Sequence, residues 1–295
     1  MTRRPVLAPG LAIVQRAPGE LQIGLTAAHR LRIADSPAVR RTLALLDRGE
    51  AAGGDAPTRR VLARLAPVLR DGDALAHPQI PAAEVAAVML RFPHSAAARL
   101  QARQAARVQV LGDLVVDPRP LFDLCGLGVY VAQRRAVPSV VLLLVRGEAD
   151  RAEADALVRS GTPHLLVRAV ESEILLGPFV VPGVTACLRC TDLHRGDEDQ
   201  TDPAAFASRS TRHDGVPDPV DAALAAMAIA WAVRDLVRFT EGDRPDCWSA
   251  VLTLTDAMDS LQPVRWPRHP RCGCSWADPV QQVAESEDAS ATMGA

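Results

Sequence analysis

The sequence contains no lysine and no asparagine, so all 33 of its basic residues are arginines. A genome rich in guanine and cytosine would account for this composition, but the chemical consequence holds whatever the cause. Chemistry that depends on a lysine amine is excluded: a Walker-type phosphate-binding loop, a Schiff base, or a lysine that neutralises a triphosphate. A nucleotide-binding role would have to rest on arginines.

Long apolar segments are absent as well. The longest apolar run, 222–233, is too short to cross a bilayer. No stretch of about 7–15 apolar residues follows the N-terminal arginines, so the sequence predicts neither a signal peptide nor a membrane partner. We expect a cytoplasmic protein, in which disulfides are rare and paired cysteines more often bind a metal or perform redox chemistry.

Charge is distributed unevenly along the chain. Residues 1–95 contain 13 arginines and 8 acidic residues, a balance of +5, whereas the whole chain has a formal charge of −2. This asymmetry predicts two domains with different partners. We place the first domain at 1–94 and the second at 95–276. The segment 277–295, which is acidic and has little apolar mass, is expected to be a disordered tail.

The first 94 residues have the ingredients of a small winged-helix-like domain. Two alternating segments flank Ala17-Pro18-Gly19, which predicts a hairpin, and a third alternating segment follows. Ser36-Pro37 is a typical helix start, with a capping serine and a proline at the first helical position. We expect strands over 11–16, 20–25 and 29–34, and helices that begin near Pro37, Thr58 and Ala82.

The remaining sequence predicts an α/β fold, because short apolar strands alternate with helical patterns. The segment 139–145 is almost continuously apolar, as a central parallel strand covered on both faces would be. A long helix is expected from Asp221 to about Thr240. We predict a Rossmann-type, mainly parallel sheet with strands over 107–112, 129–132, 139–145, 164–168 and 248–255.

Two close pairs of cysteines lie far apart in the chain, Cys187 with Cys190 and Cys272 with Cys274. Four thiolates match the tetrahedral preference of Zn²⁺, and a site with four protein ligands has no open position, so it is structural. Two alternatives stay open: a redox pair formed by the first two cysteines alone, and ordinary buried thiols. Other residues near the site are Arg189 and Arg271, which could offset its charge, and His194 and His269, which could each replace a thiolate.

The segment GPFVVPGVTACLRC (177–190), a polar loop, an alanine-rich helix and a final HPRCGC together resemble the ThiF-like, ubiquitin-activating-enzyme-like superfamily. The resemblance covers about residues 95–276 and includes SGTPHLLV (160–167). It is nearest to the branch that supplies cyclodehydratase C proteins, or leader-peptide-binding proteins, for thiazole/oxazole-modified peptides. The resemblance implies a ThiF-like domain with a winged-helix-like leader-recognition element, a precursor leader peptide and a YcaO-type cyclodehydratase as partners, and allows a homodimer.

The sequence departs from active members of this superfamily where ATP would bind. After the first strand, VLGDLVVDPRP offers only Gly112, with Val115 and Val116 where the backbone must approach phosphate. Asp113 and Asp117 would repel phosphate. We therefore expect a degenerate nucleotide site, with no ATP, no catalytic residue and structural Zn²⁺ as the one cofactor.

Three functions follow as hypotheses. The first is a peptide-binding scaffold of a bacteriocin-type cyclodehydratase, with the edge of 29–34 and the helix near 82–90 capturing an acidic leader as an added strand. The second is an active adenylyltransferase that uses arginines in place of lysine. The third is a winged-helix DNA-binding regulator, although nucleic acid is not the expected partner because a charge of +5 is modest. Candidate peptide-binding residues are Arg30, Arg32, Arg40 and Arg41, and candidate triphosphate residues are Arg103, Arg107, Arg134 and Arg135.

Overall fold

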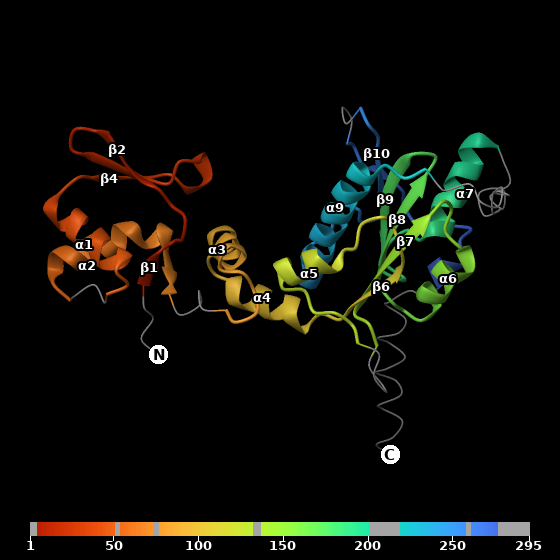
Figure 1. Ribbon diagram of the computed structural model, residues 1–295, viewed down its shortest axis with the longest axis horizontal. Coiled ribbons are helices and arrows are strands. Elements are labelled where there is room, and N and C mark those ends of the chain that lie inside the picture. The colour runs from red at the N-terminus through yellow and green to blue at the C-terminus, as the bar shows by residue number, and fades with distance from the viewer. Residues whose placement is uncertain are drawn as a thin grey trace, which may run out of the picture. The chain divides into compact units, whose positions relative to one another are not determined.

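The computed structural model describes residues 5–50, 54–72, 77–131, 137–200, 219–257 and 261–276. These residues form two compact units (Figure 1). The first contains the described residues up to Ala102 together with Leu124–Gly126, and the second contains the others from Arg103 onward. The predicted tail, 277–295, lies outside the described residues.

A three-stranded antiparallel sheet, in the order β2-β3-β4, opens the first unit. Its strands are β2 (Ile13–Ala17), β3 (Glu20–Ile23) and β4 (Leu31–Ala34). The predicted hairpin and third strand are thus present. β4 is shorter than predicted because Ala27–His29 forms a 3-10 turn, η1. Since β3 is the middle strand, both β2 and β4 are edges of this sheet.

Helices α1 (Pro37–Asp47) and α2 (Ala56–Leu65) build the main core of this unit with β3 and β4. The Ser36 hydroxyl caps α1 by accepting from the Val39 N–H at 3.3 Å. α2 begins before the predicted Thr58, because the Asp55 carboxylate accepts from the Thr58 N–H at 2.7 Å and acts as the cap. A small sheet that the sequence pattern did not indicate pairs β1 (Pro5–Leu7) with β5 (Leu69–Asp71), which follows the short η2 (Ala66–Val68).

A second, separate core in this unit lies between α3 (Ala82–Arg91) and the start of α4 (Ala96–Ala105). Val85 and Val88 of α3 pack there with Leu100 of α4. Helix α3 therefore belongs to a different apolar cluster from β4, although the peptide-capture hypothesis pairs the two.

The second unit contains a six-stranded sheet in the order β11-β10-β9-β8-β7-β6. Only β6, β7 and β8 are parallel, so the prediction of a mainly parallel sheet is confirmed in part. β9 runs antiparallel to β8 because only Glu171 and Ser172 connect them, both with positive φ (51° and 72°), as in the tight turns of hairpins. The strands are β6 (Val108–Gly112), β7 (Val140–Arg146), β8 (His164–Val170), β9 (Glu173–Val180), β10 (Ala250–Leu254) and β11 (Val264–Arg265).

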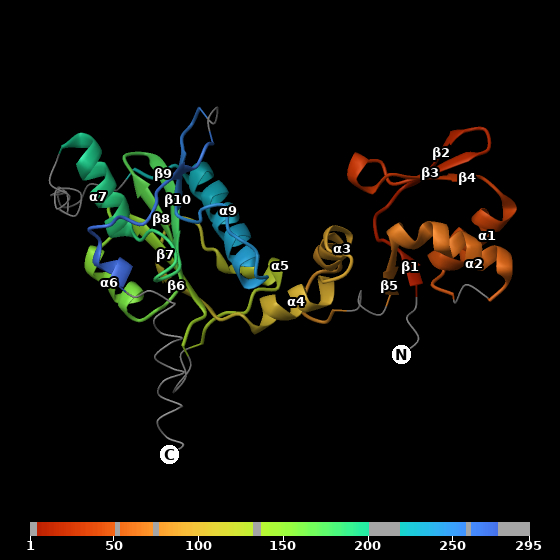
Figure 2. The same ribbon diagram turned by 180° about the vertical axis from the view of Figure 1, so that it is seen from behind.

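Helices cover both faces of this sheet. α9 (Ala222–Thr240) packs on β8 and β9 from one side, while α6 (Arg151–Arg159) and α7 (Leu188–Asp199) lie on the other (Figures 1 and 2). The short helix α5 spans Arg119–Cys125, and η4 spans Gly273–Trp276. The strand predicted at 129–132 is reduced to a single parallel bridge between Val108 and Val129. None of the described helices has the length and apolar character needed to cross a membrane.

Candidate metal centre

The four sulfur atoms of Cys187, Cys190, Cys272 and Cys274 lie within 4.8 Å of one another. The Cys187 Sγ is 3.7 Å from the Cys190 Sγ and 3.6 Å from the Cys272 Sγ, and the Cys190 Sγ is 3.3 Å from the Cys274 Sγ. All four cysteines are free thiols. The structure thus brings together two cysteine pairs that lie more than 80 positions apart in the sequence.

This geometry fits a tetrahedral metal ion. Zn–S bonds of about 2.3 Å place the corners of a ZnS₄ tetrahedron about 3.8 Å apart, close to the sulfur separations of 3.7, 3.6 and 3.3 Å. Disulfide bonding would require about 2.05 Å. Cys187, Cys190 and Cys272 are buried and Cys274 is half-buried, so water does not solvate the sulfurs freely. The donor set therefore has the spacing, the chemistry and the burial that a structural Zn²⁺ requires.

The first pair is positioned by the start of α7. Cys187 is the N-cap residue of this helix, and Cys190 lies in its first turn, where a helix end favours negative charge. The turn that leads from β9 into α7 is fixed by hydrogen bonds to two hydroxyls. The Thr185 Oγ1 accepts from the Val181 N–H at 2.7 Å, and the Ser249 Oγ accepts from the Ala186 N–H at 2.9 Å.

The second pair lies on a turn after β11. The Cys272 N–H donates to the His269 carbonyl at 3.0 Å, which closes the turn. Arg268 then connects this turn to the first, because its guanidinium donates to the Gly183 carbonyl at 2.8 Å and to the Cys274 carbonyl at 3.5 Å. The two turns are therefore linked by a side chain as well as by the sulfurs.

The sulfur cluster distributes negative charge unequally among its members. Hydrogen bonds from neighbouring thiols, above all from Cys187, lower the pKa of the Cys190 thiol, and the same contact raises the pKa of Cys187. The pKa of Cys274 is lowered to about 7, first by its hydrogen bond with Cys187. Four sulfurs at this spacing cannot all ionise without a cation, which is the charge that Zn²⁺ would supply.

The two candidate histidine ligands are engaged elsewhere. The His269 Nδ1 accepts from the Arg271 N–H at 3.1 Å, which leaves the proton on Nε2, and Nε2 donates to Asp197 at 3.0 Å. His194 donates from Nε2 to the Pro267 carbonyl at 2.9 Å and stacks on Trp266. Both histidines thus support the second turn and lie outside the four-sulfur set.

Arg189 and Arg271, the arginines expected to offset the charge of the site, are paired with carboxylates. The Arg189 Nε donates to Asp155 at 2.7 and 2.8 Å, and Arg271 pairs with Asp197. Their charges are therefore largely compensated by acids. A backbone N–H group also donates a hydrogen bond to the cluster: the N–H of His269 helps to lower the pKa of Cys190.

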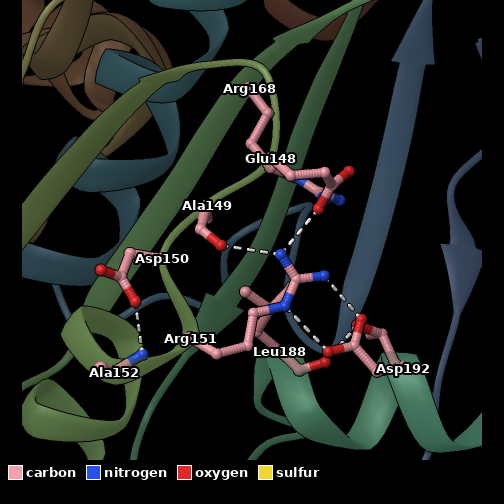
Figure 3. Close-up of polar contacts among 9 residues, drawn as sticks. Glu148, Ala149, Asp150, Arg151, Ala152, Arg168, Leu188 and Asp192 are labelled. Atoms are coloured by element: carbon pink, nitrogen blue, oxygen red, sulfur yellow. Dashed lines mark hydrogen bonds and ion pairs between the residues drawn. The ribbon is translucent and has the colours of Figure 1, made fainter. Parts of the chain in front are cut away.

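Beside α7, the carboxyl ends of β7 and β8 are occupied by a network of four charged side chains (Figure 3). Arg151 donates to Asp192 at 2.9 and 3.0 Å and to Glu148 at 2.7 Å. Arg168 donates to both Glu148 oxygens at 2.8 and 2.9 Å. Burial opposes the ionisation of Glu148, but the two guanidinium groups outweigh it and hold its pKa below the usual value. The charges in this network neutralise one another.

The end of β6 and the loop after it are where the sequence resemblance implies a triphosphate. Gly112, the last residue of β6, has φ +74°, and a Cβ there would lie 2.0 Å from the Leu144 carbonyl oxygen of β7. Close strand packing thus requires this glycine. Asp113 follows and pairs with Arg146 at 3.0 Å. The described residues at these strand ends offer acids and paired cations, and they do not fit a triphosphate.

The candidate triphosphate arginines do not gather at a common point among the described residues. Arg103 is fully buried and pairs with Glu241 at 2.6 Å. Arg107 donates to the Val137 carbonyl at 2.8 Å. Arg134 and Arg135 lie outside the described residues.

The four candidate peptide-binding arginines are all exposed in the first unit. Arg32 lies on β4, Arg30 directly precedes it, and Arg40 and Arg41 lie on α1. Arg40 is engaged by Asp35, with two hydrogen bonds of 2.7 and 2.6 Å. The structure places Arg30 and Arg32 at the β4 edge, and among the described residues Arg40 is the one of the four that forms an ion pair.

No family model and no curated protein matches this sequence. Solved structures do match. A heterocyclase in complex with substrate and cofactor has a TM-score of 0.59 and 17% identity over 94% of this chain and 40% of its own. The heterocyclase TruD has a TM-score of 0.59 and 16% identity, over 92% of this chain and 43% of its own. E. coli MccB, solved with MccA-N7isoASN, has a TM-score of 0.53 and 12% identity, over 92% of this chain and 99% of its own.

The chain shares its fold with these proteins. The resemblance to ThiF-like proteins of the heterocyclase branch, inferred from the cysteine motifs, is therefore confirmed at the level of the fold. The chain spans about two fifths of the two heterocyclase chains and nearly all of MccB. The match covers more than nine tenths of this chain, so it includes the N-terminal unit as well as the ThiF-like one.

Proposed function

We propose that the protein is a peptide-binding scaffold of a ribosomal-peptide cyclodehydratase, of the thiazole/oxazole, bacteriocin type. In this proposal, residues 1–94 bind the leader region of a precursor peptide, and the ThiF-like domain docks a YcaO-type enzyme that performs the ATP chemistry. The observation that carries it is the fold shared with a heterocyclase solved with its substrate and with MccB solved with MccA.

The edge of β4 is our candidate for peptide capture. β4 is the last strand of its sheet, and among the described residues no strand pairs with its outer side. An added peptide strand would gain main-chain hydrogen bonds there. Arg30 and Arg32 are exposed and form no ion pair within the described part of the chain, so they are available to an acidic leader. Arg41 on α1 is exposed as well, and the Asp55 carboxylate lies near enough to interact with its charge.

We assign the four-cysteine cluster a structural Zn²⁺. Cys187, Cys190, Cys272 and Cys274 would hold the ion, and four protein ligands leave no position for water or substrate. The ion would fix the turn after β11 to the start of α7, so that the last described segment is fastened to the sheet. Its contribution is therefore to the shape of the ThiF-like unit that meets the partner enzyme.

A scaffold role agrees with the closed strand ends of β6, β7 and β8. The network of Glu148, Arg151, Arg168 and Asp192 is neutral within itself, and the loop after β6 offers acids to any phosphate. The alternative of an active adenylyltransferase requires ATP in this region. ATP–pyrophosphate exchange with a peptide acceptor tests that alternative, and we expect no activity above background.

The proposal is tested with a short precursor peptide and a YcaO-type enzyme encoded beside the gene. Both are expected to bind the purified full chain, the peptide through β4. Arg32→Glu should weaken peptide binding at least tenfold, because it reverses the charge at the edge. Arg60→Glu, which changes an exposed arginine of α2 in the same unit, should alter it less than twofold. Binding of neither molecule would refute the proposal, and salt-sensitive binding to duplex DNA alone would favour a regulator.

A further inference from the structure

The first unit contains a hollow of about 520 Å³ that none of the assignments above uses. Its apolar lining residues come from η2, β5, the end of α3 and the start of α4, and they include Pro67, Leu69 and Met89. Its volume falls within the range of about 300–1,000 Å³ that is typical of small-ligand pockets. The hollow is lined by different elements from the β4 edge.

Arg70 of β5 is the cation of this hollow. Its Nε donates to the Met89 carbonyl at 2.8 Å, and its Nη1 donates to the Leu69 and Pro67 carbonyls at 2.7 and 3.0 Å. These carbonyls fix the guanidinium but bring no negative charge. Within the described part of the chain Arg70 has no carboxylate partner, in contrast to Arg103, Arg151 and Arg168.

Two further features favour an anion beside Arg70. Burial lowers the pKa of Arg70, so its charged form would be stabilised by a carboxylate. Ala96 and Ala97, the first two residues of the ten-residue helix α4, also line the hollow. The first N–H groups of a helix lack intrahelical partners and carry partial positive charge.

The other titratable groups at the hollow are His94 and Asp71. His94 is exposed and brings no negative charge. Asp71 has interactions of its own, and no ion pair joins it to Arg70 among the described residues. The hollow therefore combines apolar side chains with an arginine that has no carboxylate partner within the described part of the chain, which is complementary to an acidic side chain beside an aliphatic one.

We propose that this hollow binds a glutamate or aspartate, together with a neighbouring aliphatic residue, of the same peptide that β4 captures. The carboxylate would meet Arg70 and the start of α4, and the aliphatic side chain would lie against Met89 and Pro67. This inference rests on the proposed function. A second anchor on one peptide raises the overall affinity through effective concentration, without new contacts at β4.

The test uses the full chain and a probe too short to pair as a strand. Acetyl-Leu-Glu-amide is titrated while the Nε–Hε signal of Arg70 is followed by NMR. A saturable shift is expected, with acetyl-Leu-Gln-amide binding at least tenfold more weakly. Equal shifts with both dipeptides would overturn the proposal. The same shift with sodium acetate at the same concentration would show an adventitious anion only.

A matched pair of variants tests the site without removing Arg70, whose carbonyl contacts support the fold. Ala97→Asp places a carboxylate in the hollow at a helix start that tolerates it, and should abolish the shift. Ala97→Asn should leave the dissociation constant within twofold. Indifference to Ala97→Asp would overturn the proposal.

The failures of the two proposals can be told apart. Loss of precursor binding in Arg32→Glu, with the dipeptide shift intact, is expected if both proposals hold. Precursor binding that persists unchanged in Ala97→Asp would refute the second anchor and leave capture at β4 standing. A dipeptide shift in a chain that binds no precursor would refute the scaffold proposal and the assigned peptide together.

Discussion

The four-cysteine cluster and the carboxyl ends of β7 and β8 lie in the same unit and differ in how their charges are balanced. At the strand ends, Glu148 and Asp192 face Arg151 and Arg168, so acids and bases compensate one another inside the protein. At the cluster, four sulfurs face one another, and the adjacent arginines are already paired with carboxylates. The charges of the first site are balanced by its own side chains, whereas the second requires a cation.

This difference separates two kinds of buried polar site. A network whose charges compensate one another has little capacity to bind a charged ligand, although removing one of its members destabilises the folded protein. A cluster of like donors has a large affinity for the ion that unites them. The carboxyl ends of β7 and β8 have the first character, and the C-terminal turns have the second.

The largest expected effect is at the cluster. Cys190→Ser should reduce bound zinc from one per chain to near zero and destabilise the protein by on the order of 5 kcal/mol or more, since structural zinc contributes up to about 10–16 kcal/mol in small domains. Metal analysis and denaturant unfolding measure both quantities. Cys125→Ser, outside the cluster, is the control and should keep its zinc. Equal stability of the two variants would contradict a structural metal.

The ion-pair network should give the next largest effect. Arg151→Ala leaves Asp192 buried without its partner and should cost about 3–5 kcal/mol. Arg119→Ala removes an exposed pair with Asp117 and should cost less than about 1 kcal/mol. Urea unfolding at neutral pH compares the two. If the two variants lost similar amounts of unfolding free energy, the network would be exposed to water. The strand ends would then not be a site that balances its own buried charges.

Acid should weaken the same network. Because the pKa of Glu148 is lower in the folded than in the unfolded chain, its ionisation stabilises the protein above the unfolded value of about 4.5. This stability is lost as the pH falls through the lower, folded value. Glu148→Gln should therefore be less stable than wild type at pH 7, and the difference should narrow below pH 4.5. A constant difference between pH 7 and pH 3, measured by thermal unfolding, would disprove the role of this carboxylate.

The smallest expected effect is that of nucleotide. Millimolar Mg·ATP should leave the melting temperature unchanged, because the strand ends do not fit a triphosphate. A working site at a ligand concentration of 100 times its Kd would add about 2.7 kcal/mol to the stability. Such a gain would show that the network opens, and it would favour the adenylyltransferase alternative.

The sequence was informative where local chemistry decides the structure. Hairpin residues, helix caps and the paired cysteines predicted β2, β3, α1 and the sulfur cluster. It was incomplete for the sheet: the strand β9 was not predicted, and a two-residue turn at Glu171 and Ser172 makes it antiparallel to β8 in a sheet that was expected to be mainly parallel. Positive φ at two such residues has no strong sequence signal.

The ion-pair network was missed, although it had a signal. Arg168 is an arginine within the apolar strand 164–170, and a buried strand position tolerates an arginine only with a partner. Its partner Glu148 lies 20 residues away, beyond the reach of local patterns. The hollow at Arg70 was not foreseeable, because it depends on how η2, β5, α3 and α4 meet.

Four thiolates that hold one structural zinc ion would be visible in the metal content of the purified full chain, grown with zinc and dialysed without chelator. We expect one zinc per chain, retained by the Cys125→Ser variant and absent from a Cys272→Ser variant. A folded, stable chain with metal content near zero would contradict it.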